Sequence, residues 1–292
     1  MDDMLLTVEI AQWLPQLEES LRQQLAWALE LGKIIYFPQL SFDVREDEAA
    51  LLSPLLLSGE RKNISLEGGG VRGASGSPEI QEQLARMIGR FSDQANQLVH
   101  SLFPRYAPAL SSARTSFRPA AVDNRASSPT KDDSRLHIDA FPSRPNRGER
   151  ILRVFCNINP FDTPRRWRIG EPFEQAARHF LPGIRRPLPG SARLMSALGI
   201  TKGRRSEYDH IMLSLHDRMK LDAAYQENAP QQSISFAPHS TWICFTDQVL
   251  HAAMSGQHMM EQTFHLPIDM QYHPETSPLK VLERLCERAL VA

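Results

Sequence analysis

From about residue 113 onward, the sequence is a succession of short apolar runs separated by proline, asparagine and aspartate. Six such runs can be read in this part of the chain: TSFRPAAV, RLHIDAF, ILRVFCNI, QSISFA, TWICFTD and QTFHLPI. Runs of this length between turn-forming residues are typical of strands in an antiparallel sheet. The pattern therefore predicts an antiparallel sandwich or barrel, which forms the core of the chain over residues 113–272.

Helical patterns precede, interrupt and follow these strands. Residues 1–112 are expected to be mainly helical and to pack on the core, with leucines at helical spacing in PQLEESLRQQLAWALELG and one short buried strand, KIIYFP. A second long helix is predicted to begin after Ser77, which is an N-cap followed by proline. The segments FEQAARHFL and SEYDHIMLSLHDRMKLDAAYQ predict a helical insertion at about residues 171–228, and Ser277 caps a C-terminal helix within residues 273–292.

The glycine-rich stretch GGGVRG, residues 68–73, matches the spacing of a dinucleotide-binding fingerprint. That fingerprint requires a strand before it, a helix directly after it and an acidic residue further along. The surrounding sequence offers none of these convincingly, and the glycines continue to Gly76. The stretch is therefore expected to be a lid or linker loop rather than a nucleotide site.

The chain of 292 residues is long enough for one large domain or two small ones. Its three cysteines, Cys156, Cys244 and Cys286, lie far apart and form no CxxC pair, which argues against a disulfide scaffold or a zinc finger. The acidic N-terminus does not have the pattern of a signal peptide, and no apolar run has the length of a membrane span. These features predict a cytoplasmic protein.

The net charge of −1 conceals an uneven distribution. Residues 114–205 contain 19 Lys and Arg but only 8 Asp and Glu, and 17 of the basic residues are arginine. An excess of arginine favours recognition of carboxylate or phosphate, although a solvated basic face is an alternative interpretation. Because the basic residues are dispersed and accompany no basic–aromatic module, nucleic-acid binding is not expected.

The run RLHIDAF contains a histidine and an aspartate two residues apart, His137 and Asp139. In a strand, side chains at i and i+2 point to the same face, so an imidazole and a carboxylate are presented together. These are two of the three groups of a 2-His-1-carboxylate iron site. His251, expected near the end of the late strand TWICFTD, is the preferred third ligand, and His239 and His265 beside the late strands are alternatives.

These motifs carry a family resemblance. The run KDDSRLHIDAFPSRPNRGERILRVFCNINP, followed by RRWRIGEPFE, resembles the Kdo hydroxylases over roughly residues 113–272. More widely, the pattern is similar to Fe(II)/2-oxoglutarate-dependent oxygenases. The resemblance implies a mainly β fold with flanking helices and a double-stranded β-helix (jelly-roll, cupin-like) core. It also implies Fe(II), 2-oxoglutarate and O2, with His137, Asp139 and His251 as iron ligands.

By the same resemblance, the reaction hydroxylates C3 of 3-deoxy-D-manno-oct-2-ulosonic acid (Kdo) in the lipopolysaccharide inner core and releases succinate and CO2. The substrate is then a Kdo-bearing lipid A. Its sugar carboxylate and lipid phosphates call for cationic partners around the HxD motif. The candidates for this role are Arg125, Arg135, Arg144, Arg147 and Lys131.

One position departs from the wider oxygenase pattern. Many members bind the far carboxylate of 2-oxoglutarate with an arginine on the last core strand, but this region reads MMEQTFHLP, with no basic residue. A buried dicarboxylate without a cation is unfavourable, so another arginine is required. Arg153 is the first candidate and Arg118 the second, with Asn157 and Gln262 as possible hydrogen-bond donors to the cosubstrate.

Two other functions are compatible with these residues. One is a 2-oxoglutarate oxygenase acting on another small molecule or on a protein, and the other is a non-catalytic jelly-roll module that holds a metal. A lipid substrate also implies peripheral contact with the cytoplasmic face of the inner membrane. The amphipathic helices near the two termini are expected to pack on the core more readily than to enter the membrane. The sequence does not indicate an oligomeric state.

Overall fold

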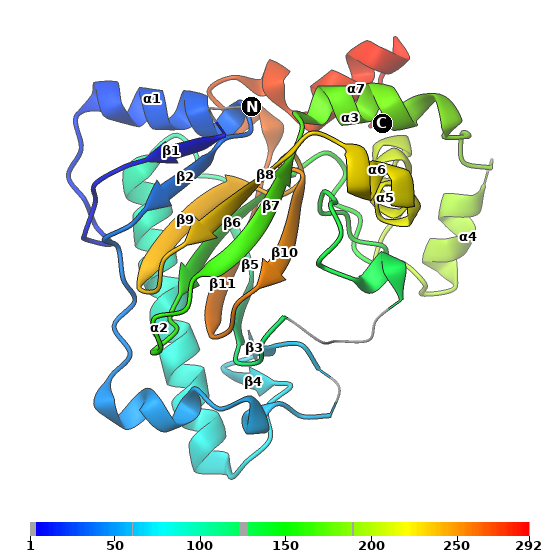
Figure 1. The fold of residues 1–292 in the computed structure, drawn as a ribbon. Helices are drawn as coiled ribbons and strands as arrows, with labels where there is room; N and C mark the ends of the chain where they lie inside the picture. Colours follow the sequence, from blue (N-terminus) through cyan, green and yellow to red (C-terminus); the bar gives the residue numbers. More distant parts are fainter. Residues whose placement is uncertain (1–3, 60, 123–127, 189, 292) are drawn as a thin grey trace.

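The computed structural model describes residues 4–59, 61–122, 128–188 and 190–291 and contains two sheets (Figure 1). The larger sheet has eight strands in the order β1-β2-β9-β6-β11-β5-β3-β4, and the smaller has three in the order β10-β7-β8. The strands of the larger sheet are β1 (Leu5–Thr7), β2 (Ile34–Phe37), β9 (Ser240–Phe245), β6 (Arg150–Asn157), β11 (Met259–Leu266), β5 (Ser111–Arg118), β3 (Ile64–Glu67) and β4 (Gly70–Arg72). Those of the smaller are β10 (His251–Ser255), β7 (Arg165–Gly170) and β8 (Gln231–Phe236).

All strand pairs in these sheets are antiparallel except β1 with β2, among the residues that the structure describes. The two sheets enclose an aromatic core. Trp242 of β9 stacks on Phe236 of β8 at 4.0 Å between ring centroids, and Trp167 of β7 meets Trp242 edge to face at 5.5 Å. Such contacts add to the burial of large apolar surfaces. The expected jelly-roll core with flanking helices is confirmed.

A second core lies on the opposite face of the larger sheet, against α1 (Glu19–Glu30) and α2 (Pro78–Leu102). Alternation along β6 sends Leu152, Val154 and Cys156 into this core. The residues between them therefore face the smaller sheet. The N-cap of α2 is confirmed, because the Ser77 hydroxyl accepts a hydrogen bond from the Ile80 amide at 3.4 Å.

A group of helices packs beside the sheets, on the side away from α1 (Figure 1). It consists of α3 (Phe173–Phe180), α4 (Ser191–Ala197), α5 (Glu207–Leu221), α6 (Ala223–Asn228) and α7 (Pro278–Cys286). The predicted helical insertion at residues 171–228 corresponds to α3 through α6, and Ser277 caps α7 as expected. The apolar faces of α1 and α7 are buried in the protein, which agrees with the expectation that the terminal helices pack on the core.

Two local predictions were wrong. The run RLHIDAF is not a regular strand, since only an isolated bridge joins His137 to His251. An Asx turn immediately precedes it, in which the Asp132 carboxylate accepts the Ser134 amide at 2.9 Å. The glycine-rich stretch is not a linker but the hairpin β3–β4. Its turn residues Gly68 and Gly69 have φ of 60° and 84°, a conformation that glycine adopts without steric cost.

The N-terminal third therefore supplies four strands to the larger sheet as well as the helices α1 and α2. The sequence predicted β2 but not β1, β3 or β4, which are only three or four residues long. In the described parts of the chain, no helix has the length and apolar character needed to cross a membrane.

A buried ion pair joins the beginning of β6 to the end of β9. Arg150 and Asp247 both have 0% exposed side chains, and the Arg150 Nε donates to the Asp247 carboxylate at 2.7 Å. The Arg150 guanidinium also donates to Gln248 at 2.6 Å and lies 3.8 Å from the ring centroid of Phe245. Burial raises the pKa of Asp247 and the guanidinium opposes that shift. The pair fixes the start of β6 against the turn that follows β9.

Asp247→Ala is expected to lower the free energy of unfolding by about 3–5 kcal/mol, because it leaves the Arg150 charge buried without its partner. Denaturation by urea, followed by circular dichroism, measures the change. Asp269→Ala, at an exposed aspartate, is the matched control and should stay within about 0.5 kcal/mol of the wild type. Equal stability of the two variants would show that the turn after β9 does not depend on this pair.

Candidate metal centre and its charged cavity

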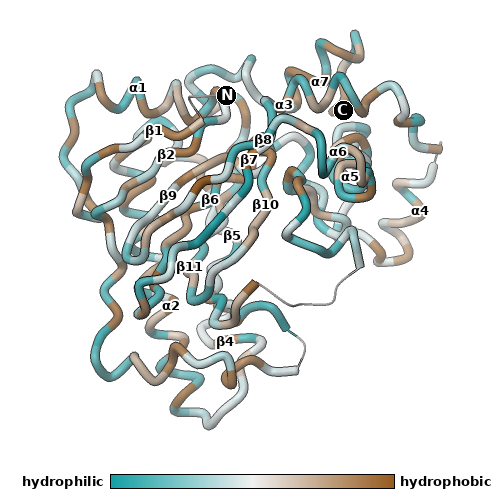
Figure 2. Tube along the Cα trace, in the orientation of Figure 1, coloured by the Kyte–Doolittle hydropathy of each residue, from teal (hydrophilic) through white to brown (hydrophobic). Residues whose placement is uncertain are grey.

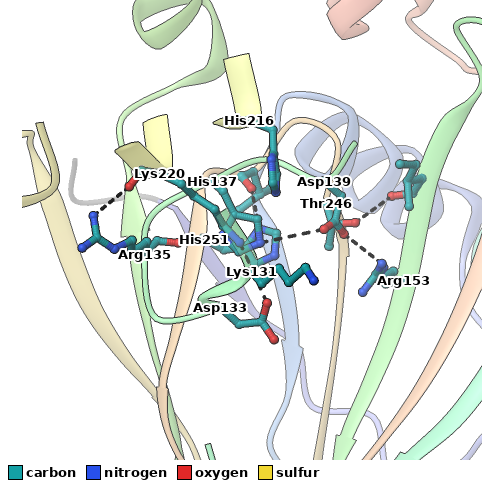
Figure 3. A network of polar contacts seen from close by, with 12 residues as sticks. Lys131, Asp133, Arg135, His137, Asp139, Arg153, His216, Lys220, Thr246 and His251 are labelled. Atoms are coloured by element: carbon teal, nitrogen blue, oxygen red, sulfur yellow. Dashed lines mark hydrogen bonds and ion pairs between the residues drawn. The ribbon is translucent and has the colours of Figure 1, made fainter. Parts of the chain in front are cut away.

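His137, Asp139 and His251 come together at one point between the two sheets (Figure 3). One ligand atom from each residue lies within 4.8 Å of the others, and the His137 Nε2 is 3.9 Å from the Asp139 Oδ1. The two histidines are held by a pair of backbone hydrogen bonds between them, of 3.1 and 2.9 Å. His251 is the first residue of β10 rather than part of the preceding strand, because a turn at residues 246–250 separates β9 from β10.

The two imidazoles are oriented by their other ring nitrogens. The Nδ1 atoms of His137 and His251 lie 2.7 and 2.8 Å from the backbone carbonyls of Arg135 and Val249. Since a carbonyl only accepts, each Nδ1 carries the proton and each Nε2 keeps its lone pair. Burial lowers the pKa of both histidines, and for His137 the neighbouring His251 and Lys220 lower it further. Both rings are therefore neutral and able to bind a metal.

Asp139 is held by its backbone and by its side chain. Its amide donates to the Thr246 carbonyl at 2.8 Å, and the Thr246 side chain hydrogen-bonds to its carboxylate (Figure 3). The Arg153 guanidinium lies 3.0 Å from the Asp139 Oδ2. Burial acts to raise the pKa of Asp139, but the Arg153 guanidinium, together with the Thr246 hydrogen bond, outweighs it and holds this pKa well below the ordinary value. The carboxylate is therefore ionised.

The chemistry of this set fits Fe(II). Two neutral imidazoles and one carboxylate on one side of a metal leave positions for other ligands on the opposite side. No other group of three potential ligands occurs among the described residues, so the alternatives His239 and His265 do not join the centre. His239 lies in the turn between β8 and β9, and His265 lies near the other end of β11.

The centre opens into a cavity of about 120 Å³. Three arginines line it, Arg118 from β5, Arg153 from β6 and Arg165 from β7. Glu261 of β11 lies between the first two. The Glu261 carboxylate accepts from Arg153 at 2.8 Å and contacts the Arg118 guanidinium at 3.0 Å. Burial raises the pKa of Glu261, but the two arginines outweigh it and the net shift is downward. The expected orientation of Arg153 into the core of the fold is what the structure shows.

Arg153 also offers an unsatisfied donor. Its Nε is buried and has no hydrogen-bond partner within the described part of the chain. A buried donor of this kind lowers the stability of the protein unless another group accepts a hydrogen bond from it. The carboxylate of 2-oxoglutarate is a suitable acceptor, so the residues present fit this cosubstrate as well as the metal.

Asn157 and Gln262 are not placed to contact the cosubstrate. Gln262 points to the opposite face of the sheet, where its side chain bonds to Ser92 of α2 at 3.0 Å and to Thr115 at 2.5 Å. Asn157 shares the face of Arg153, but its amide donates to the carbonyls of Thr163 and Phe236. The expected contacts of both side chains with the cosubstrate do not fit this arrangement, since their polar atoms already serve the fold.

The proposed substrate-binding residues are scattered around the centre. Arg135 donates to the Lys220 carbonyl at 2.8 Å, and the Lys131 carbonyl accepts from Lys62 at 2.7 Å, just before the HxD motif. Arg144 lines a surface hollow of about 260 Å³ that is also lined by Arg61, Arg72 and Arg114.

Two more of these arginines lie further from the centre or cannot be placed. Arg147 lines another surface hollow with Arg204 and Arg205, and its backbone amide donates to Asp209 at 2.9 Å. Arg125 lies outside the described residues.

Sequence reasoning missed several charged groups at the cavity. Asp133 lies 3.1 Å from Lys62, 3.6 Å from Arg118 and 3.9 Å from the buried Lys220. Although burial acts in the opposite direction, Arg118 and Lys62 lower the pKa of Asp133 to about 2. Glu261 had a detectable signal, because an acidic residue within an apolar strand needs a cationic partner. Asp133 lies in a turn and Lys220 in a helix, and no local sequence pattern indicated that either residue approaches the cavity.

Comparisons with known proteins agree with this geometry. The family model described as 3-deoxy-D-manno-oct-2-ulosonic acid (Kdo) hydroxylase matches residues 12–289. This chain belongs to the Kdo hydroxylase family. The resemblance seen in the HxD region thus extends over nearly the whole chain, including the N-terminal third. The comparison with curated proteins gave no match.

Solved structures of the Kdo hydroxylase KdoO, a non-heme Fe(II) alphaketoglutarate-dependent dioxygenase, have the same fold. A cobalt(II) complex is 46% identical, with a TM-score of 0.96 over 99% of this chain and 98% of that one. A complex with alphaketoglutarate and Fe(III) is 45% identical, with a TM-score of 0.94 over 98% and 97%. A complex with succinate and Fe(III) is 45% identical, with a TM-score of 0.95 over 99% and 98%. This Kdo hydroxylase is likewise a dioxygenase that uses Fe(II), 2-oxoglutarate and O2.

His137→Ala, Asp139→Ala and His251→Ala are each expected to weaken metal binding by the Kdo hydroxylase at least about 100-fold, because each removes one of three ligands. Calorimetric titration of the apoprotein with Co(II) measures this loss. His239→Asn is the matched control, since asparagine tolerates the positive φ of 61° at this position. Unchanged Co(II) affinity in any of the three alanine variants would remove that residue from the centre.

Proposed function

We propose that this enzyme hydroxylates C3 of Kdo in a Kdo-bearing lipid A, with His137, Asp139 and His251 as the ligands of Fe(II). The observation that carries the proposal is the three-residue centre, whose imidazole tautomers and ionised carboxylate suit Fe(II). It occurs in a chain that belongs to the Kdo hydroxylases over nearly its whole length. Succinate and CO2 are the expected co-products.

When bound, the iron couples the oxidative decarboxylation of 2-oxoglutarate to hydroxylation of the sugar. The protein's own residues prepare the site for this reaction. The carbonyls of Arg135 and Val249 fix the two imidazoles, and Thr246 fixes Asp139. The Trp167 ring stacks on His251 at 5.2 Å and walls the site on its apolar side. This rigid surround limits which part of a substrate can approach the centre.

For the cosubstrate, we infer that Arg153 binds the far carboxylate of 2-oxoglutarate. The free Nε donor and the location of its guanidinium in the cavity support this assignment. Glu261 keeps the guanidinium in place from the other side. Arg118 is the second candidate, because it lines the same cavity and pairs with the same glutamate.

For the substrate, we propose that Arg135, Arg144, Arg147 and Lys131 contribute to the binding of its carboxylate and phosphates, with Arg125 as a further candidate. The support is their position around the HxD segment and, for Arg144, a hollow lined by three more arginines. A lipid substrate also means that the enzyme works in peripheral contact with the cytoplasmic face of the inner membrane. No nucleic-acid partner is expected.

The direct test is an aerobic incubation of the purified enzyme with Fe(II), 2-oxoglutarate, ascorbate and Kdo-bearing lipid A. Mass spectrometry of the lipid and measurement of succinate should show one added oxygen per succinate formed, and neither product with His137→Ala. Fragmentation of the product locates the hydroxyl at C3. Succinate without lipid oxidation would identify an oxygenase with another substrate. Neither product, with iron binding confirmed, would favour the non-catalytic module.

Arg153→Lys is expected to raise the KM for 2-oxoglutarate by roughly 10- to 100-fold, because a charge-assisted hydrogen bond contributes about 1.5–3 kcal/mol and lysine cannot bind bidentately. The KM for the lipid should change much less. The matched control is Arg166→Lys, at an exposed arginine of β7. A larger effect of Arg118→Lys than of Arg153→Lys would transfer the assignment to Arg118.

A further inference from the structure

One segment of the helical layer combines basic charge with exposed apolar side chains. Residues 185–205 contain six Lys and Arg and no Asp or Glu. They surround the short helix α4, which lies at the outer edge of the helical layer, away from the sheets (Figure 1). Residues 185–188 and 190–205 of this stretch are described, and they are called the basic–apolar segment below.

Four large apolar side chains of this segment are exposed to solvent. Leu188 is 79% exposed, Leu194 60%, Leu198 65% and Ile200 56%. They account for four of the eleven exposed large apolar residues in the described parts of the chain, within only 13 positions. Scattered apolar residues on a surface need no explanation, but a local concentration marks a site of contact.

The exposed side chains lie on elements that bury little against the rest of the protein. No residue of α4 is buried, and Leu194 and Leu198 lie four residues apart, on one face of the helix and its C-cap. In Figure 2, hydrophobic and hydrophilic stretches follow one another closely around α4. Local packing therefore does not account for the leucines.

The segment is nevertheless attached to the body of the protein. The Lys202 amide donates to the Ser143 carbonyl at 2.8 Å, and the Arg205 guanidinium bonds to the Pro142 carbonyl. Thr201 is buried at 3% exposure. Surface hollows of about 510 and 600 Å³ adjoin its two ends, the first lined by Arg185 and Arg186 and the second by Arg204 and Arg205.

From these observations we propose that the basic–apolar segment binds the surface of an anionic bilayer. Its four exposed apolar side chains enter the boundary between headgroups and acyl chains, and its exposed basic side chains, Arg193 and Arg204 among them, pair with lipid phosphates. Both interactions are typical of interfacial segments, and neither is sufficient alone. The proposal deepens the peripheral membrane contact of the proposed function and rests on it for the lipid substrate. It places this contact on α4 and its flanks, where four exposed apolar side chains lie within 13 positions of a segment without acidic residues.

The position of the segment relative to the metal centre suits a lipid-linked sugar. The segment ends at the N-terminus of α5, and His216 further along α5 lies 5.4 Å from the ring of His137. The rise of a helix separates Glu207 from His216 by roughly 14 Å. One helix therefore connects the segment to the metal centre, at a distance that the headgroup of a lipid can span.

Co-sedimentation with vesicles tests the proposal on the full chain. Wild-type protein should bind vesicles of phosphatidylcholine containing phosphatidylglycerol, and binding to phosphatidylcholine alone should be much weaker. Leu194→Ser with Leu198→Ser should lower the partition coefficient on the order of tenfold. Arg193→Glu with Arg204→Glu should lower it at least as much, because each cation near an anionic surface contributes about fivefold.

Matched controls use similar side chains elsewhere on the surface. Leu55→Ser removes a leucine that is 86% exposed, and Arg86→Glu reverses an exposed arginine of α2. Both should bind vesicles like the wild type. The proposal is overturned if wild-type protein does not bind anionic vesicles, if the segment variants bind normally, or if the controls lose binding equally.

A water-soluble Kdo oligosaccharide separates this inference from the proposed function. The segment variants should oxidise this soluble substrate at the wild-type rate, while their turnover of Kdo-lipid A in vesicles falls. If vesicle binding depends on the segment but no Kdo substrate is oxidised, the proposed function fails and the lipid-binding surface stands. If both substrates are oxidised normally by the segment variants, the surface is wrong and the proposed function stands.

Discussion

The compensation of charges buried between the two sheets is the constraint on which the site depends. Asp139 pairs with Arg153, Arg153 with Glu261, Glu261 with Arg118, and Arg118 with Asp133, so that signs alternate along one continuous chain of contacts. An isolated charge in such a place would be neutralised or expelled. Because each neighbour supplies the opposite charge, the carboxylate of the metal centre stays ionised and the guanidinium groups stay oriented before any ligand binds.

Backbone hydrogen bonds position the two histidines of the metal centre. The bridge between His137 and His251 joins an irregular segment to the first residue of a regular strand, and two carbonyls set the tautomers of the imidazoles. Aromatic rings occupy the space beyond, with Trp167 against His251. The cavity thus has an apolar side, formed by aromatic rings such as Trp167, and a charged side, formed by Arg153, Glu261 and Arg118. The metal centre lies where the two sides meet. Catalysis of this type requires such a fixed geometry.

Much of this could be read from the sequence, and the failures have physical causes. The short apolar runs between turn-forming residues predicted β5, β6, β8, β9 and β11. His137 and Asp139 meet as expected, although the segment that carries them is not the regular strand from which their spacing was interpreted. The predicted contact of Gln262 with the cosubstrate was wrong, because this side chain lies on the other face of β11. A shift of one residue moves every side chain of a strand to the opposite face. Pairing with strands distant in the sequence decides which face each residue takes. Asp133 and Lys220 approach the cavity through tertiary packing alone, which no local pattern records.

The corner formed by Thr246 and Asp247 has a consequence for how the enzyme moves. Thr246 holds the carboxylate-bearing residue of the centre, and its neighbour Asp247 holds the completely buried Arg150 at the start of the strand that carries Arg153. Site and core are therefore linked through two adjacent residues, and loosening of the metal centre is expected to be coupled to loosening of the sheet. The surrounding loops and helices are therefore the parts expected to move when a bulky sugar enters. The same scaffold can thus accept changes in substrate at its rim while its oxidative chemistry stays fixed.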